Sequence, residues 1–566
     1  MSLFGSIQMA GNTLQAMQIG LHVVGNNIAN ANTPGFIRER TIFTPAPVQK
    51  IGHLTLGLGV EIAGIVQNID KFAEERLRGA GGDRAGAEVQ ENAYKDLEAI
   101  LGELDDKSDL STALTNFFNS LDEVAGAPEN VSIRNLAVRA GKTLAEDINK
   151  RARGVETIYR DFETKVENLS TEINSLTEQV RKLNLQIVGL EGGRQASSEA
   201  GGLRSQRNNA IKRLSEIADV EAKETTTGSV NVSLHGEQLV FEGTRREVEV
   251  AYSTQDNLPV ATIRFADTES DLEAGGGELY GTYQARDEIV GGFLTRLDDF
   301  AAALAFEFNK VFSQGQGITG YKSITSQNAV DDSQAGLDAA GLAFTPTSGT
   351  FDVLVYNTQT KLTQTHTIHV DLDGLDNDTS LSSLVSQIDA ISGVSAQATS
   401  DNRLRILSDS AELQISFDGD TSGALAALGL NTFFTGSNAA DLAVNPELLA
   451  DGSKFAASRA GIGVDVTNVQ RLVALHDEGV DGLGGSSFTG LYDQLVNDTA
   501  QGSAAASSIA DGYRVFEDTL AASAQAVSGV NLDEEAIDMI MLQQTYQASA
   551  RYISVLSELM DVLINL

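Results

Sequence analysis

The sequence predicts a multi-domain α+β protein with coiled-coil helices at both termini, a central helix-rich domain and an inserted β-rich domain. Three observations predict this class: a heptad pattern at each end, helical periodicity through much of the middle, and one long stretch of short β-branched runs. The chain has 566 residues, too many for one hydrophobic core, and its 42% apolar content is typical of packed globular structure. Several folded domains are therefore expected.

The first expected element is a helix within residues 1–33. Apolar side chains recur there in alternating steps of four and three residues, which is the pattern of a coiled-coil seam. Four glycines interrupt the same stretch, and each costs about 1 kcal/mol relative to alanine inside a helix. We therefore expect a helix that is marginal alone and that ends at Pro34-Gly35, a pair suited to a type II turn. The seam consists of Leu3, Ile7, Ala10, Leu14, Met17, Leu21, Val24 and Ile28.

A second heptad helix is expected over residues 531–566. Asn531 can cap its first turn, and the acidic residues that follow complement the positive end of the helix dipole. We expect the two terminal helices to pair with each other, while a second apolar row makes the later helix wide enough to meet other subunits. The seam consists of Met539, Leu542, Tyr546, Ser549, Ile553, Leu556, Met560 and Leu563, and the second row of Met541, Ala548, Val555 and Val562.

A helix-rich domain with a β element is expected over residues 34–320, completed by residues 455–530. Helical periodicity runs from about Val155 to Leu190 and again from Asp287 to Phe312. Between Ser229 and Phe265, apolar and polar residues alternate between turn signals, which predicts strands. The terminal helices thus enclose the inner elements in sequence.

Residues 321–454 are expected to form the inserted β-rich domain. Their composition shifts to Ser, Thr, Asp and Asn with β-branched runs, separated by turn clusters. His366 and His369 stand three residues apart, and such positions face opposite sides of a strand, which favours two polar strand residues over a metal site. The acidic turn from Asp371 to Asp378 leaves calcium a minor alternative, because Leu375 and Ser382 replace two ligands of a calcium loop.

Composition excludes several classes of function. Lys and Arg number 40 against 78 Asp and Glu, and the net charge of −38 repels nucleic acids and anionic lipid surfaces. With no cysteine, the chain has neither a thiol nucleophile nor a thiolate metal ligand. No run of about 18 apolar residues and no signal-peptide pattern occurs, so membrane insertion is not expected. No local catalytic cluster stands out, and we expect neither a cofactor nor enzymatic activity.

Motifs at both ends resemble those of the bacterial flagellar rod, hook and hook-associated protein family. The N-terminal match runs from Gly25 to Phe36, and the C-terminal match from Gln543 to Arg551. The two matches are separate and stand in the order that the family requires. The motif residues are Asn26, Asn27, Ile28, Asn30, Thr33, Pro34, Gly35, Phe36, Gln543, Gln544, Tyr546 and Ala548.

Three inner stretches narrow the resemblance to the hook-associated members, among which is the protein that joins hook to filament. They are the runs Leu203–Asn208, Val230–Val240 and Gly276–Gly281. Hook proteins are not expected to carry them. Asn208 departs from the family pattern, which usually has an acidic residue there, and this puts one local ion pair in doubt.

The resemblance implies a structural role at the hook–filament junction. Members polymerise into a ring-like helical layer, with paired terminal helices inside and the β-rich domain outermost. The implied partners are other copies of the chain, the hook protein, the next hook-associated junction protein and a flagellar export chaperone. The resemblance also implies type III export without a cleaved signal peptide and an extracellular location. The alternatives are another axial subunit, such as the hook protein, and a secreted calcium-binding adhesin.

Overall fold

A computed structural model describes most of the chain, in two compact units that are each discontinuous in sequence. The first unit comprises Met1–Asn92, Asp161–Arg286 and Ala504–Leu566, and the second comprises Ala93–Arg160 and Asp287–Ser503. The structure describes residues 3–51, 54–102, 110–192, 199–255, 258–375, 378–463, 465–480 and 484–565. The expected helix-rich and β-rich regions are both present, which confirms the multi-domain α+β class. The predicted domain boundaries stay predictions.

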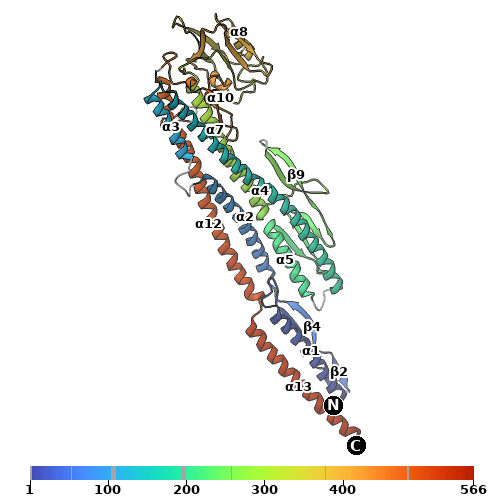
Figure 1. Cartoon of the computed structure of the whole chain (residues 1–566). Coiled ribbons are helices and arrows are strands. Elements are labelled where there is room, and N and C mark those ends of the chain that lie inside the picture. Colours follow the sequence, from blue (N-terminus) through green and yellow to red (C-terminus); the bar gives the residue numbers. More distant parts are fainter. Residues whose placement is uncertain are drawn as a thin grey trace. The chain divides into compact units, whose positions relative to one another are not determined.

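The terminal helices belong to the first unit and lie side by side (Figure 1). Helix α1 spans Leu3–Ala29 and helix α13 spans Leu532–Ile564, close to the predicted bounds. They run antiparallel, since the end of α1 contacts the beginning of α13. Between α1 and the next helix, strands β1 (Glu39–Pro45) and β4 (Val60–Gln67) pair antiparallel, and so do β2 (Val48–Ile51) and β3 (Leu54–Gly57).

Long helices make up the body of the first unit. Helices α2, α4 and α12 contribute to both units, whereas α5 and α6 belong to the first alone. An antiparallel four-stranded sheet and the β9–β10 hairpin share one core with α4, α5 and α6. The helices are α2 (Lys71–Leu101), α4 (Val131–Glu191), α5 (Gly201–Ile217), α6 (Gly277–Gln284) and α12 (Phe488–Ser528). The strands are β5 (Val220–Glu224), β6 (Val230–Leu234), β7 (Glu237–Phe241), β8 (Thr244–Arg245), β9 (Val248–Gln255) and β10 (Leu258–Phe265).

The second unit contains the predicted β-rich segment and further helices. A hydrophobic core made from residues between Tyr321 and Leu430 joins two three-stranded sheets, in the orders β11-β15-β14 and β13-β12-β16. The strands are β11 (Ser323–Thr325), β12 (Gly349–Asn357), β13 (Thr363–Val370), β14 (Val394–Ala398), β15 (Leu404–Ser408), β16 (Leu413–Asp418), β17 (Phe434–Thr435) and β18 (Ala443–Val444). The helices are α3 (Leu110–Gly126), α7 (Gly291–Phe312), α8 (Leu381–Asp389), α9 (Ala424–Leu428), α10 (Pro446–Ala450) and α11 (Thr467–Ala474).

Two helical bounds differ from the sequence prediction. Helix α4 begins at Val131, well before the expected Val155. Its first half buries alanines (Ala137, Ala145 and Ala152) among larger apolar residues (Val138, Leu144 and Ile148), and this mixture weakens the periodic signal. The helix expected to begin at Asp287 is preceded by α6, and a short π-helical segment at Ala285–Val290 joins α6 to α7. Within the described residues, we find no helix with the length and apolar character needed to cross a membrane.

Candidate assembly site

The two terminal helices bury an apolar seam between them. Met17 and Val24 of α1 are buried in one cluster with Leu542 of α13. Gly20 permits this approach, since a Cβ built on it would lie only 3.2 Å from Cδ1 of Leu542. One of the four glycines that weaken α1 therefore also lets its partner helix come close.

Almost all predicted seam residues face inward. Every one whose side chain the structure describes is buried or half-buried, except Tyr546, which is 37% exposed. The side chain of Leu563 lies outside the described residues. The seam residues of α1 are Leu3, Ile7, Ala10, Leu14, Met17, Leu21, Val24 and Ile28, and those of α13 are Met539, Leu542, Ser549, Ile553, Leu556 and Met560. Their role in assembly stays a prediction.

Polar side chains of the N-terminal motif connect α1 to the first turn of α13. Buried Asn27 donates from Nδ2 to the carbonyl of Glu39 at 2.8 Å and to Oε2 of Glu535 at 3.0 Å. Nε of Arg38 donates to the other oxygen of Glu535 at 2.6 Å. Glu535 is only 1% exposed, so its charge is balanced by Arg38 in a nearly dry setting. We call Asn27, Arg38 and Glu535 the terminal lock.

The rest of the N-terminal motif builds the turn that leads out of α1. Nδ2 of Asn30 donates to the carbonyl and side-chain oxygens of Asn26, and Thr33 donates to Oδ1 of Asn30 at 3.1 Å. The Phe36 amide donates to the Thr33 carbonyl at 3.1 Å, and Gly35 has φ +71°, which confirms the predicted type II turn around Pro34. A Cβ on Gly35 would also overlap the side chain of Asn209 on α5.

The side of α13 away from the seam is apolar and uncovered. Residues of the C-terminal motif, Gln543, Gln544, Tyr546 and Ala548, are all exposed, although Tyr546 lies in the row of the seam. The predicted second row is exposed as well, and further large apolar side chains extend it. We call this surface the open face; its large members, each more than half exposed, are Ile537, Ile540, Met541, Val555, Leu559 and Val562.

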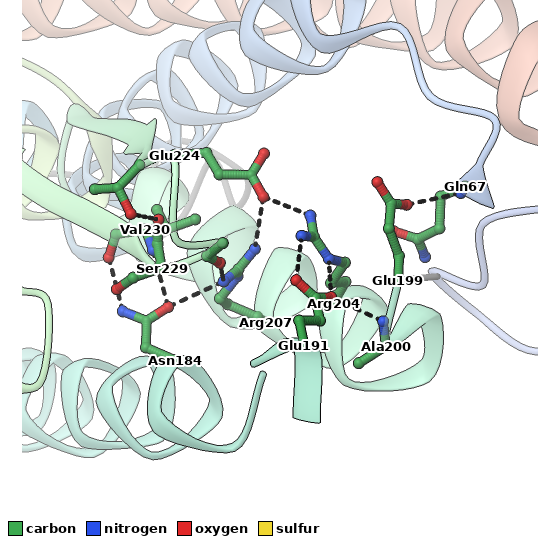
Figure 2. A network of polar contacts seen from close by, with 12 residues as sticks. Gln67, Asn184, Glu191, Glu199, Ala200, Arg204, Arg207, Glu224, Ser229 and Val230 are labelled. Atoms are coloured by element: carbon green, nitrogen blue, oxygen red, sulfur yellow. Dashed lines mark hydrogen bonds and ion pairs between the residues drawn. The ribbon is translucent and has the colours of Figure 1, made fainter. Parts of the chain in front are cut away.

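The first inner motif places two arginines at the centre of a polar network on α5 (Figure 2). Arg204 makes two 2.9 Å contacts with Glu191 at the end of α4 and a further ion pair with Glu224 of β5. Arg207 is buried and donates to Oδ1 of Asn184 at 3.0 Å and to the carbonyl of Gly228. Burial lowers the pKa of Arg207 to about 10. The motif therefore fixes α5 to α4 and to the sheet.

The other two inner motifs provide tight backbone geometry. His235 and Gly236 both have positive φ, 46° and 90°, as a two-residue turn between β6 and β7 requires. Gly277 has φ +81°, and a Cβ on it would lie 2.6 Å from the carbonyl oxygen of Ile217. A Cβ on Gly281 would overlap the backbone of Gly86, so α6 packs directly on α2. Glycine is thus favoured by backbone conformation at Gly236 and required by close packing at Gly277 and Gly281.

The metal alternatives are only partly described. His366 and His369 lie on strand β13, as the sequence predicts. The carboxylates of Asp371, Asp373 and Asp378 lie within 4.8 Å of one another at the surface, while Asp376 falls outside the described residues. Such exposed acidic groups are common without an ion.

Sequence reasoning missed two members of the terminal lock. Glu535 is one of three acids in the first turn of α13, and the helix dipole alone explains acids there. Arg38 follows the N-terminal motif by two residues and carries no signal of its own. The contact between Glu535 and Arg38 could be predicted only if the pairing of α1 with α13 were already known.

Three family models match separate parts of the chain. They are described as flagella basal body rod protein, over residues 7–36, flagellar hook-associated protein FlgK helical domain, over residues 94–325, and flagellar basal body rod FlgEFG protein C-terminal, over residues 522–566. Together the matched ranges span more than half of the chain. With the paired terminal helices, they define a structural protein of the bacterial flagellum.

Whole-length relatives narrow this class. The chain is 26% identical over 586 residues to flagellar hook-associated protein 1 of Escherichia coli (strain K12), and 25% over 589 residues to that of Salmonella typhimurium (strain LT2), with 99% of each chain covered. The hook-associated protein 1 of Bacillus subtilis (strain 168) is 26% identical over 56% of this chain and 68% of its own. Over nearly its whole length the chain is thus similar to flagellar hook-associated proteins. A solved structure titled as the flagellar hook junction protein FlgK from Burkholderia pseudomallei aligns with a TM-score of 0.48 and 13% identity, over 80% of this chain and 100% of that one.

Proposed function

We propose that the chain is a non-enzymatic structural subunit of the layer that joins hook to filament, and that it polymerises through its terminal helices. The observation that carries this proposal is the open face of α13. A contiguous apolar surface of this kind marks a binding site for another protein. The opposite side of the same helix is already occupied by α1, so the open face is free for a neighbouring copy.

Assembly and folding of the ends are coupled. Gly11 and Gly25 have no other part of the chain within 4 Å of a built Cβ, and most seam residues of α1 are only half-buried. Glycine therefore destabilises the helix, and the partial burial of its apolar side chains does not fully compensate. Neighbouring copies that cover the terminal pair supply the missing burial, and the ends become ordered as the layer forms.

The partners follow from the similarity to hook-associated proteins and from this mechanism. The layer contacts the flagellar hook protein on one side and the next hook-associated junction protein on the other. Before export, a flagellar export chaperone covers the open face of α13 and keeps it from associating too early. The chain leaves through the flagellar type III channel without a cleaved signal peptide and functions outside the cell.

Two triple serine variants test the proposal. Ile540→Ser, Val555→Ser and Val562→Ser together remove apolar area from the open face while leaving the seam to α1 intact. We expect chaperone binding and polymerisation to fall together, with unchanged melting of the rest of the protein. A matched control with Gln547→Ser and Glu558→Ser alters exposed polar positions of the same helix and should behave as the wild type.

The second triple variant attacks the seam. Ile553→Ser, Leu556→Ser and Met560→Ser should also reduce chaperone binding and polymerisation, because α13 then loses its buried side. Pull-down with the chaperone, sedimentation of polymer and imaging of the hook tip measure these effects. If the open-face variant still binds the chaperone and still forms a junction, the open face is not the assembly surface.

A further inference from the structure

A cavity of about 450 Å³ lies in the first unit beside the polar network of α5. It is bounded by α2, α5 and strand β5. Five cationic side chains and four carboxylates line it, although acids outnumber basic residues by 78 to 40 in the whole chain. The cations are Lys71, Arg78, Arg204, Arg207 and Lys223, and the acids are Glu74, Glu75, Glu199 and Glu224.

One carboxylate in this wall serves three cations. Glu224 contacts Lys71 at 2.6 Å, forms an ion pair with Arg204 and lies 3.7 Å from Arg207, and Figure 2 shows it between the two arginines. Burial acts to raise the pKa of Glu224, but the cations outweigh it and the pKa is lowered. Glu191, outside the wall, already pairs with Arg204. Glu224 is thus left to balance Lys71 and Arg207, two cations against one carboxylate. Nε of Arg207 is buried and has no hydrogen-bond partner.

Arg78 of α2 lines the same cavity and has no carboxylate partner among the described residues. Its side chain is half-buried and lines the cavity, yet within the described ranges it makes neither an ion pair nor a hydrogen bond. Burial lowers the pKa of Arg78, and the attraction of Glu74 and Glu75 offsets only part of this effect. No nitrogen of Arg78 is among the buried unpartnered atoms of the described residues, so its five N–H donors are open toward the cavity and can meet an anion that enters it.

We propose that this cavity binds a carboxylate or phosphate group, with Arg78 as its direct contact. A second anion shares the cations that now crowd around Glu224 and uses the planar donor fork of Arg78. The group comes either from a small oxyanion in solution or from an acidic side chain of another copy of the chain. The chemistry of recognition is the same for both sources.

Titration of inorganic phosphate into the full chain, followed by calorimetry, tests the proposal. We expect saturable binding to the monomer, and Arg78→Gln should weaken it about tenfold or more because a charge-assisted contact is lost. Arg76→Gln is the matched control, since Arg76 is exposed on the same helix and does not line the cavity. It should leave the dissociation constant unchanged.

A second variant places an anion in the cavity permanently. Asn208 also lines the cavity, so Asn208→Asp supplies an internal carboxylate that should compete with phosphate and weaken its binding. Circular dichroism verifies that both variants are folded. Absence of saturable binding to the wild type, or equal losses in Arg78→Gln and Arg76→Gln, would overturn the proposal.

The same titration of polymerised protein separates the two sources. If phosphate still binds after assembly, the natural ligand is a free oxyanion. If binding disappears on assembly and Arg78→Gln also raises the protein concentration needed for polymerisation, a neighbouring copy supplies the carboxylate. Both results require the anion site, whereas retained binding in Arg78→Gln excludes it.

Discussion

The terminal lock offers the sharpest test of coupled folding and assembly. Replacing Glu535 by alanine removes the acceptor of both Arg38 and Asn27 and separates the N-terminal motif from α13. The neighbouring Glu534 also contacts Arg38, at 3.0 Å, but its side chain is 58% exposed. Glu534→Ala is therefore a matched control that removes the same charge from the same helix turn.

The expected magnitude follows from the partners that remain. A hydrogen bond to a charged group contributes about 1.5–3 kcal/mol, and Glu535→Ala loses two of them. Neither donor is left alone, since Arg38 keeps Glu534 and Asp538 and Asn27 keeps the Glu39 carbonyl. The remaining partners offset part of the simple sum of about 3–6 kcal/mol, and we therefore expect a net loss of about 2–3 kcal/mol. An exposed pair such as that of Glu534 contributes about 0–1 kcal/mol.

The assay is the protein concentration at which polymer first sediments. If the lock closes only on assembly, its free energy enters polymerisation in full, and each 1.4 kcal/mol changes this concentration about tenfold. Glu535→Ala should then raise it about 30- to 150-fold and Glu534→Ala less than about fivefold. Equal concentrations for the two variants, or no change in either, would refute the idea that the ends fold as they assemble.

Two further predictions concern the ends and the β-rich segment. The monomer should show rapid amide hydrogen exchange over Leu3–Ile28. Gly11→Ala or Gly25→Ala should stabilise the helix by about 1 kcal/mol and so slow this exchange, whereas Gly20→Ala, which crowds Leu542, should not. Strong protection of these amides in the wild-type monomer would contradict the prediction. Replacing residues 321–430 with a short linker should leave export and junction formation largely intact, and complete loss of filaments with the shortened protein folded and exported would contradict that expectation.

The replacement of residues 321–430 stops at Leu430 because the residues that follow pack in a second core, which the sequence does not reveal. Phe433 and Phe434 lie beyond the core of the β-rich segment. They pack in tilted and edge-on geometries against Phe117 and Phe308 from two helices, with ring centroids 5.2–5.7 Å apart. A deletion through residue 454 would open that aromatic cluster. Composition changes smoothly across this region, so no local signal separates the two cores.

The elements that could be predicted are those whose cause is local. The seams of α1 and α13, the cap at Asn531 and the turn at Pro34-Gly35 all follow from spacing or residue type within a few positions. Asn531 accepts from the amides of the next turn as expected. The terminal lock depends on partners that are far apart in the sequence, and so do the glycines at close contacts, such as Gly35 and Gly281. A sequence pattern that spans a few turns cannot include both partners of such a contact.

Helix α8 was also missed, for a different reason. It is nine residues long and lies between strands, capped by Ser380 and Ser383, which bond reciprocally. Serine there is equally typical of the turns that separate strands. A short helix in a segment rich in Ser and Thr is therefore hard to distinguish from a loop.

The separation of the lock residues in sequence determines the order in which the protein can fold. Asn27 and Glu535 are 508 positions apart, and closing a loop of that length in an unfolded chain costs about 5 kcal/mol or more in entropy. Folding of the rest of the first unit removes most of that cost, because the Arg38 amide then meets the Ser528 carbonyl at 2.9 Å and the two ends are already neighbours. The terminal pair is consequently the last part to close and the first to open, and a chain emerging end-first from a narrow channel cannot form it until its final residues are out.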